Sequence, residues 1–119
     1  MAASVITETM VHTITPAQLA ELLQTQAVDL IDVRDRSEWD AGHIEGARLV
    51  PLDVLRADPD AVLVHGTTLV FVCAKGVRSM QAAKLAERFG YADVYNVEGG
   101  TKEWARIGLA LASEQRAAA

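Results

Sequence analysis

The chain has 119 residues and a mass of 12.8 kDa, a size that suits one domain with a single hydrophobic core. Hydrophobic residues make up 50% of it but aromatic residues only 5%, so the core must consist largely of Val, Leu, Ile and Ala, as in a buried sheet flanked by helices. A net charge of -5 argues against nucleic acid or an anionic membrane as a general partner, because both require a basic surface.

The first half of the chain predicts short strands that alternate with short helices. Thr15 is placed to cap a helix whose first turn contains Pro16, and Leu19, Leu22 and Leu23 are spaced to face a core. The expected elements are a strand at 11–14, that helix up to Gln26, a strand at 28–33, a short exposed helix at 35–41 and a short strand at 48–50.

The second half contains the most strongly patterned strand. Residues Thr68–Val72 read T-L-V-F-V, a run without polar alternation that is typical of a central strand buried on both faces. Because strands alternate with helices, an α/β domain with a mostly parallel sheet is expected. The other expected elements are a helical stretch from Pro51 that falters at Asp58 and Pro59, a helix from Arg78 or Ser79 that buries Ala82, Leu85, Ala86 and Phe89, a strand at 93–97 and a helix at 101–107.

No repeat, low-complexity tract or linker interrupts the chain, so one domain over residues 1–119 is expected, with a core at about 12–111. The polar or Ala-rich ends, Met1–Met10 and Ser113–Ala119, are expected to be loose. No apolar run approaches the roughly 20 residues of a membrane span, and Met1–Val11 lacks a basic segment followed by an apolar one. A cytoplasmic location is the resulting expectation.

Cys73 is the only cysteine, so it cannot form a disulfide within the chain. Neither a C-x-x-C pair nor a cluster of Cys and His is present, and no metal site is expected. A lone cysteine of unknown context is more often a small core residue than a reactive thiol. The residues that follow Cys73 shift this balance.

The segment C-A-K-G-V-R, Cys73–Arg78, lies between the buried strand and the next helix, where open α/β sheets bind ligands. A cysteine there faces the free N–H groups of the helix N-terminus, while Lys75 and Arg78 add positive charge, and all these effects favour the thiolate. Gly76 lets the loop turn so that backbone N–H groups converge on an anion. The alternative is a Cys73 that merely ends its strand, with both cations solvated, but the combination favours a reactive site.

Three motifs follow one another along nearly the whole chain. They are L-I-D-V-R-D-R-S-E-W-D-A-G-H-I-E-G-A at Leu30–Ala47, V-F-V-C-A-K-G-V-R-S at Val70–Ser79 and V-E-G-G-T-K-E-W at Val97–Trp104. Together they resemble the signature of rhodanese domains. The resemblance implies a rhodanese-like α/β fold of three layers, in which helices flank a central, mostly parallel five-stranded sheet.

The resemblance also implies a sulfurtransferase that carries sulfur as a persulfide on Cys73. Four residues separate Cys73 from Arg78, as in the loop of the family's sulfurtransferases, whereas the related dual-specificity phosphatases have one more. Phosphatase and arsenate-reductase activity are therefore not expected. By the same resemblance, the substrate is bound by the loop residues Ala74, Lys75, Gly76, Val77 and Arg78.

The expected donor is thiosulfate or a similar small molecule, because Lys75 stands where thiosulfate-using members of the family often carry a basic residue. The expected acceptor is a thiol, cyanide or a protein cysteine, since the chain has no second cysteine. Lys75 and Arg78 are expected to hold the departing sulfite, and no cofactor is required. Glu38 departs from the pattern of two-domain members, which often carry a substrate-contacting Arg there.

A second set of residues is expected near the loop: Asp32, Arg34, Ser79 and Trp104. Asp32, Arg34 and Glu38 are expected to form an ion-pair network that fixes the loop after their strand. Trp104 is expected to fill the core. His43 is interpreted as a hydrogen-bonded structural residue, because a thiolate nucleophile needs no general base.

The alternative function is a sulfur-carrier or protein-interaction module of the rhodanese type, whose donor and acceptor are proteins. Such a role predicts an exposed apolar patch near the loop, formed by Trp39, Val77 or Met80. An inactive rhodanese-like binding domain usually lacks the cysteine, so Cys73 counts against that third possibility.

Overall fold

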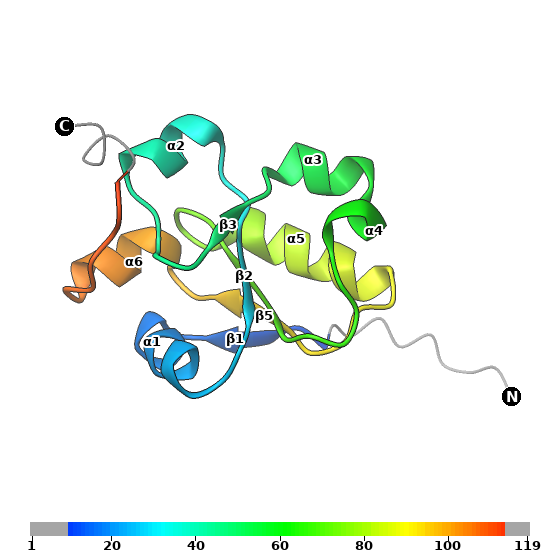
Figure 1. The fold of residues 1–119 in the computed structure, drawn as a ribbon, viewed down its shortest axis with the longest axis horizontal. Helices are drawn as coiled ribbons and strands as arrows, with labels where there is room; N and C mark the ends of the chain where they lie inside the picture. Colours follow the sequence, from blue (N-terminus) through cyan, green and yellow to red (C-terminus); the bar gives the residue numbers. More distant parts are fainter. Residues whose placement is uncertain (1–9, 114–119) are drawn as a thin grey trace, which may run out of the picture.

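The computed structural model describes residues 10–113, in which five parallel strands form one sheet with helices on both faces (Figure 1). The expected α/β fold is confirmed. Most of the ends expected to be loose, residues 1–9 and 114–119, lie outside the described residues. In sheet order the strands are β1 His12–Ile14, β5 Val94–Val97, β4 Leu69–Val72, β2 Asp29–Asp32 and β3 Arg48–Leu49. The helices are α1 Pro16–Thr25, α2 Arg36–Ala41, α3 Leu52–Ala57, α4 Pro59–Val62, α5 Val77–Arg88 and α6 Gly100–Arg106.

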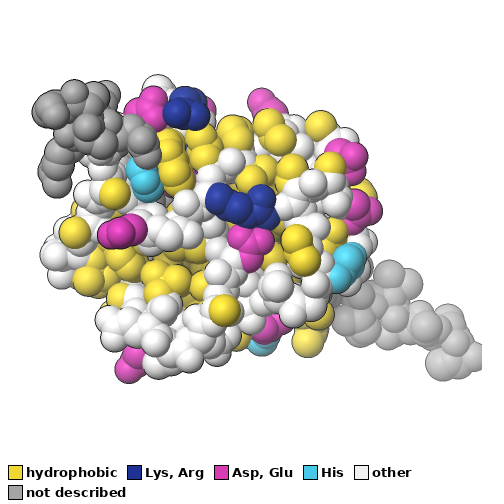
Figure 2. Space-filling view, in the orientation of Figure 1, with side chains coloured by type: hydrophobic (Ala, Val, Ile, Leu, Met, Phe, Trp, Pro, Cys, Tyr) yellow, Lys and Arg dark blue, Asp and Glu magenta, His cyan; other side chains and the backbone are white. Residues whose placement is uncertain are grey.

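The surface carries no single dominant charge on the face shown in Figure 2, where acidic and basic side chains are scattered among apolar atoms. This face therefore shows no extended basic surface. Among residues 10–113, no helix is long and apolar enough to cross a membrane.

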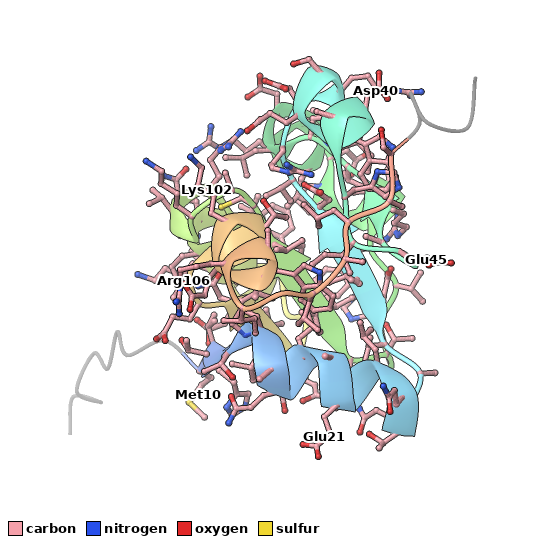
Figure 3. All side chains as sticks on the ribbon, turned by 90° about the vertical axis from the view of Figure 1, so that its left-hand side faces the viewer. Met10, Glu21, Asp40, Glu45, Lys102 and Arg106 are labelled. Atoms are coloured by element: carbon pink, nitrogen blue, oxygen red, sulfur yellow. The ribbon has the colours of Figure 1, made fainter. Side chains whose placement is uncertain are left out.

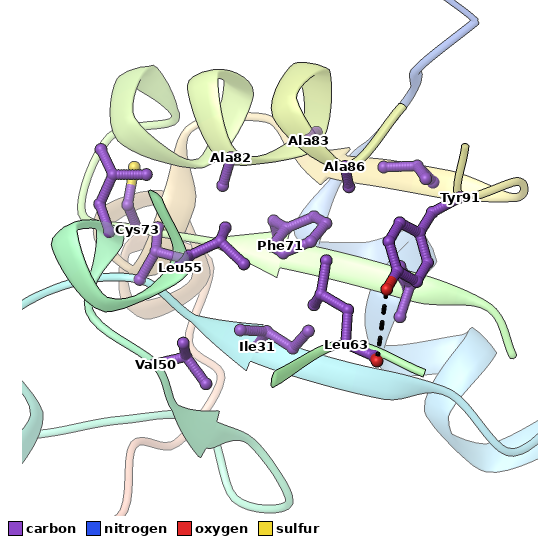
Figure 4. Close-up of a cluster of buried hydrophobic side chains, with 14 residues drawn as sticks. Ile31, Val50, Leu55, Leu63, Phe71, Cys73, Ala82, Ala83, Ala86 and Tyr91 are labelled. Atoms are coloured by element: carbon purple, nitrogen blue, oxygen red, sulfur yellow. Dashed lines mark hydrogen bonds between the residues drawn. The ribbon is translucent and has the colours of Figure 1, made fainter. Parts of the chain in front are cut away.

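The core has two layers because alternate residues of each strand point to opposite faces of the sheet. On one face α1 and α6 lie side by side (Figure 3), and Leu19 and Trp104 pack there against Leu30 and Val70. On the other face α3 and α5 cover Ile31 and Phe71 (Figure 4). The central strand β4 is buried along its whole length, as its unbroken apolar sequence predicts.

Helix α5 buries a different stripe from the one expected. Its buried residues are Ser79, Ala82, Ala83 and Ala86, whereas Phe89 is 47% exposed. The small side chains let the helix lie close to the sheet, and Phe89 comes after the last helical residue, where it faces outward. The prediction was therefore wrong for Phe89 and missed Ser79 and Ala83.

The helical stretch after β3 is broken, as expected, but it resumes after the break. Helix α3 ends at Ala57, and α4 begins at Pro59, whose fixed φ suits the first turn of a helix. Both helices lie on the α5 side of the sheet, where Leu55 and Leu63 are buried in the same cluster as Phe71.

Candidate active site

Cys73 directly follows β4 and is separated from α5 by a tight turn. Helix α5 begins at Val77, one or two residues before the expected start at Arg78 or Ser79, and Gly76 is its N-cap. Gly76 has a φ of 102°, a left-handed conformation that glycine adopts without steric cost. This turn directs the first N–H groups of α5 back toward the end of β4, where the sulfur lies.

The Cys73 sulfur is the acceptor of several hydrogen bonds. The backbone N–H groups of Gly76 and Ser79 donate to Sγ at 3.1 and 3.2 Å. Burial alone would raise the pKa of the Cys73 thiol. The pKa nevertheless lies below its ordinary value, because the Ser79 hydroxyl and the N–H groups of Ser79, Gly76 and Lys75 favour the thiolate. These contacts favour the thiolate, which is the nucleophilic form of a cysteine side chain.

A buried polar pair continues from the sulfur into the interior. The Ser79 Oγ lies 3.3 Å from Sγ and donates a hydrogen bond of 2.5 Å to Oδ1 of Asn96 in β5. Ser79 is 0% and Asn96 4% exposed. Ser79 thus touches the sulfur. Asn96 was not predicted from the sequence, although one polar residue within the otherwise apolar run of β5 was a signal that could have drawn attention to it.

The loop is also held from the opposite side by the start of α6. The N–H groups of Thr101 and Lys102 donate to the carbonyl groups of Cys73 and Ala74 at 2.8 and 3.0 Å. A Cβ atom on Gly100 would overlap with those same carbonyl groups, so only glycine permits this close approach. The motif at Val97–Trp104 therefore fixes the backbone of the motif at Val70–Ser79.

A cavity of about 320 Å³ opens above the sulfur. The predicted loop residues are brought together there, except that Gly76 does not line the cavity. Lys102 was not predicted. It lines the cavity together with Lys75 and projects from the exposed side of α6 (Figure 3). Its signal in the sequence was its place in the third motif. The lining residues are Glu38, Cys73, Ala74, Lys75, Val77, Arg78 and Lys102.

Glu38 and Arg78 form a two-pronged ion pair in this cavity. The guanidinium nitrogens of Arg78 lie 2.8 and 2.9 Å from the two carboxylate oxygens of Glu38. This contact lowers the pKa of Glu38 from 4.5 to about 2 and raises that of Arg78. The expected network is corrected here, because Glu38 of α2 pairs with Arg78 rather than with Asp32 or Arg34.

Asp32 and Arg34 form a separate buried pair. Their side chains are joined by hydrogen bonds of 2.8 to 3.1 Å, and Arg34 also donates to the carbonyl group of Gly42. None of these bonds reaches the Cys73 loop within the described residues. Arg34 instead lines a neighbouring cavity of about 360 Å³, which Arg78 borders as well. This pair therefore fixes the path of the chain between β2 and α2.

Trp104 and His43 have structural positions. Trp104 is 6% exposed, packs in the core beside α1 and donates from its indole nitrogen to the carbonyl group of Ala110 at 2.9 Å. His43 is stacked on Trp39, and its Nδ1 lies 2.9 Å from the Trp39 carbonyl oxygen. Trp39 is thus partly covered by His43. Of the three residues expected in an apolar patch, Val77 is the most exposed, at 67%.

Within residues 10–113 no group of three or more His, Cys, Asp or Glu side chains is placed to hold a metal ion.

Comparison with known proteins gives one consistent family. The model of the rhodanese-like domain matches residues 15–107. The probable adenylyltransferase/sulfurtransferase MoeZ of Mycobacterium tuberculosis is 38% identical over 96 residues, which are 79% of this chain but only 24% of that protein. The human thiosulfate:glutathione sulfurtransferase is 33% identical over 105 residues, which cover 77% of this chain and 91% of that protein.

Solved structures agree with the sequence comparison. The crystal structure of a rhodanese-like domain protein from Staphylococcus aureus superposes with a TM-score of 0.74 at 33% identity, and the match covers 86% of this chain and 97% of that one. The shared fold thus extends over nearly all of the bacterial domain.

Proposed function

The chain belongs to the rhodanese-like family, and from that membership we propose that it is a sulfurtransferase that carries sulfane sulfur as a persulfide on Cys73. The proposed donor is thiosulfate, and the proposed acceptor is a small thiol, with cyanide as a substitute in assays. The observation that carries the proposal is the environment of the Cys73 sulfur. Sγ accepts hydrogen bonds from the N–H groups of Gly76 and Ser79, and it lies on the floor of a cavity that is lined by cations. The name of the human relative includes both a thiosulfate donor and a thiol acceptor.

In the first step the Cys73 thiolate attacks the outer sulfur of thiosulfate. A new S–S bond forms on Sγ, the S–S bond of thiosulfate breaks, and sulfite departs with the electron pair of that bond. The negative charge of the thiolate moves to the outer sulfur of the persulfide. The backbone N–H groups of the loop, which converge on this position, then stabilise the charge in place of water.

The cations that contact thiosulfate are proposed to be Lys75 and Lys102. Arg78 is already engaged by both carboxylate oxygens of Glu38, so its charge is largely neutralised before an anion arrives. Lys75 and Lys102 line the same cavity and form no ion pair within the described residues. In this assignment Arg78 holds the shape of the cavity wall, and the two lysines hold the sulfonate group of thiosulfate and the departing sulfite.

In the second step a thiolate from outside the chain attacks the outer sulfur of the persulfide. The bond between that sulfur and Sγ breaks, and Cys73 leaves as a thiolate, ready for the next cycle. An acceptor from outside is required because the chain contains no second cysteine. Cyanide attacks the same atom and leaves as thiocyanate. Both half-reactions balance without a cofactor, and the kinetics are expected to be of the double-displacement type.

The second candidate function is a sulfur carrier for a protein partner. Val77 favours it, because this apolar side chain is 67% exposed and lines the cavity mouth, where a docking protein would cover it. The chain spans only about a quarter of the M. tuberculosis relative, in which the matching segment is part of a longer protein. A protein acceptor would use the same persulfide on Cys73.

The test is mass spectrometry of the purified protein after treatment with thiosulfate, with the Cys73→Ser variant as the control. A gain of about 32 Da per sulfur atom is expected on the wild type alone, and cyanide should remove it. A folded, reduced wild type that gains no mass would refute thiosulfate as the donor. If the loaded protein passes sulfur to small thiols slowly but to a protein cysteine quickly, the carrier function replaces the enzyme.

A further inference from the structure

The hydroxyl group of Ser79 has one proton and two neighbours that accept it. Its Oγ lies 3.3 Å from Cys73 Sγ on one side and 2.5 Å from Asn96 Oδ1 on the other. Ser79 is 0% and Asn96 4% exposed, so the two protein groups rather than bulk water decide where the proton points. The choice between them depends on the chemical state of the sulfur.

A neutral thiol donates its own proton to Ser79 Oγ, and Ser79 then donates to Asn96. A thiolate has no proton to give and is a strong acceptor, so the Ser79 hydroxyl turns from Asn96 to the sulfur. In the persulfide, Sγ is bonded to Cβ and to the outer sulfur, and the charge lies on the outer sulfur. Sγ is then a weak acceptor, and the hydroxyl returns to Asn96.

We propose that Asn96 is a positioning residue that holds the Ser79 hydroxyl whenever Cys73 Sγ is uncharged and releases it to Sγ when the thiolate forms. This inference rests on the proposed sulfur transfer, in which Sγ passes through both states in every cycle. An amide oxygen suits this role because it accepts a proton without carrying a charge. A carboxylate at the same place would repel the thiolate and would keep the hydroxyl turned away.

Several charged groups also face the sulfur, and they stay constant in the test. Lys75 lies in the loop, Arg78 on α5, Lys102 on α6, and Glu38 on α2. All four line the cavity, whereas Asn96 does not. A substitution at Asn96 removes no charge from the site. Its effect on the pKa of Cys73 therefore reports the hydrogen bonds that pass through Ser79.

The test measures the pKa of the Cys73 thiol from the ultraviolet absorbance of the thiolate, which is unambiguous because Cys73 is the only cysteine. Asn96→Leu should lower this pKa by about half a unit to one unit, because the neutral thiol state loses the bond from Ser79 to Asn96. Ser79→Ala should raise it, because the thiolate loses a donor. In a Ser79→Ala background, Asn96→Leu should cause no further shift.

Tyr95→Phe is the matched control, because Tyr95 neighbours Asn96 in β5 and therefore points to the other face of the sheet. It should leave the pKa unchanged. Asn96→Ala is measured beside Asn96→Leu, so that a folding defect in one variant does not end the test. An unchanged or raised pKa in both Asn96 variants, or an equal shift with and without Ser79, would overturn the inference.

The measurement separates this inference from the proposed function. If wild type acquires sulfur from thiosulfate but the Asn96 variants do not shift the pKa, the function stands and the role of Asn96 falls. If the pKa shifts as described but wild type acquires no sulfur, the coupling of Asn96 to the thiol stands and the donor assignment falls.

Discussion

At the scale of single residues, the charge balance of the cavity depends on which cations are already paired. Glu38 engages Arg78 through both of its oxygens, whereas Lys75 and Lys102 have no carboxylate partner within residues 10–113. In the proposed reaction with thiosulfate, the incoming dianion meets these two ammonium groups rather than a free guanidinium group. Lysine suits this position because its flexible stem follows an anion that arrives and departs.

Replacing Lys102 tests this balance directly. Lys102→Gln should lower kcat/KM for thiosulfate by about five- to thirtyfold, because one favourable charge contact with a dianion is lost in a water-exposed site. Lys84→Gln is the control, since Lys84 lies on the exposed side of α5 and lines a different cavity. Added salt should lower kcat/KM for thiosulfate more in wild type than in Lys102→Gln. An equal loss of kcat/KM in Lys102→Gln and Lys84→Gln would show that only the net charge of the protein affects the reaction.

The Glu38–Arg78 pair makes a prediction for stability at low pH. The folded pKa of Glu38 is lowered from 4.5 to about 2, so its stabilising effect is fully present above about pH 4.5 and is lost as the pH falls toward 2. Both side chains are about a third exposed, which limits the effect to about 1 kcal/mol.

Denaturant titrations of wild type and Glu38→Gln provide the measurement. The difference in unfolding free energy should be constant between pH 5 and 7 and should shrink between about pH 4.5 and 2. A difference that stays the same at every pH would contradict an ionised Glu38 as its cause.

At the scale of elements, the sulfur site is a junction of β4, α5 and α6. Strand β4 delivers Cys73, α5 supplies N–H donors, and α6 holds the loop through Thr101 and Lys102. Gly100 is what allows α6 to come so close to the loop backbone.

Gly100→Ala should therefore damage stability and sulfur loading together. The new Cβ would overlap with the carbonyl groups of Cys73 and Ala74, and φ is 61°, so a loss of at least about 3 kcal/mol is expected. Gly66→Ala is the matched control, because Gly66 also has a positive φ but nothing lies within 4 Å of the added atom. Gly66→Ala should lower the free energy of unfolding by about 1 kcal/mol and leave sulfur loading intact. Equal losses in unfolding experiments would mean that backbone strain, not overlap, is the cause.

The sequence predicts the elements better than it predicts the contacts between them. Helix α1 was predicted because Thr15 and Pro16 are local signals, and β4 because its apolar run is unbroken. The Glu38–Arg78 pair joins residues 40 positions apart, and no local pattern encodes such a contact.

Contacts between distant segments also explain why the sequence did not predict other residues of the site. The Cys73 loop was identified from its own residues and from family resemblance. Asn96 reaches Ser79 from β5, and Lys102 reaches the cavity from α6. Only the packing of these elements beside β4 and its loop brings the two residues to the site. The stripe on α5 was misplaced for a related reason, since the sheet beneath the helix decides which alanines are covered.

At the scale of the whole molecule, both core layers share the strand that ends at the nucleophile. Phe71 packs toward α5 and Val70 toward α6, so β4 belongs to both layers, and Cys73 lies at the edge of the Phe71 cluster (Figure 4). The site is thus expected to form and to be lost together with the entire fold.

Phe71→Ala tests this coupling. It should lower the free energy of unfolding by about 3–5 kcal/mol, because the side chain is completely buried. Circular dichroism and sulfur loading, followed against temperature, should give the same midpoint in wild type and the same lowered midpoint in the variant. Sulfur loading that is lost well before the circular dichroism signal would indicate that the site melts on its own.

The backbone bonds from Thr101 and Lys102 to the Cys73 loop also impose an order on biosynthesis. Ribosomes add about 5–20 residues per second, so these two residues are added roughly one to six seconds after the loop that they hold. In a nascent polypeptide that has been translated only through α5, the carbonyl groups of Cys73 and Ala74 do not yet have these two partners. The loop backbone is therefore expected to reach its final conformation only after α6 has been synthesised.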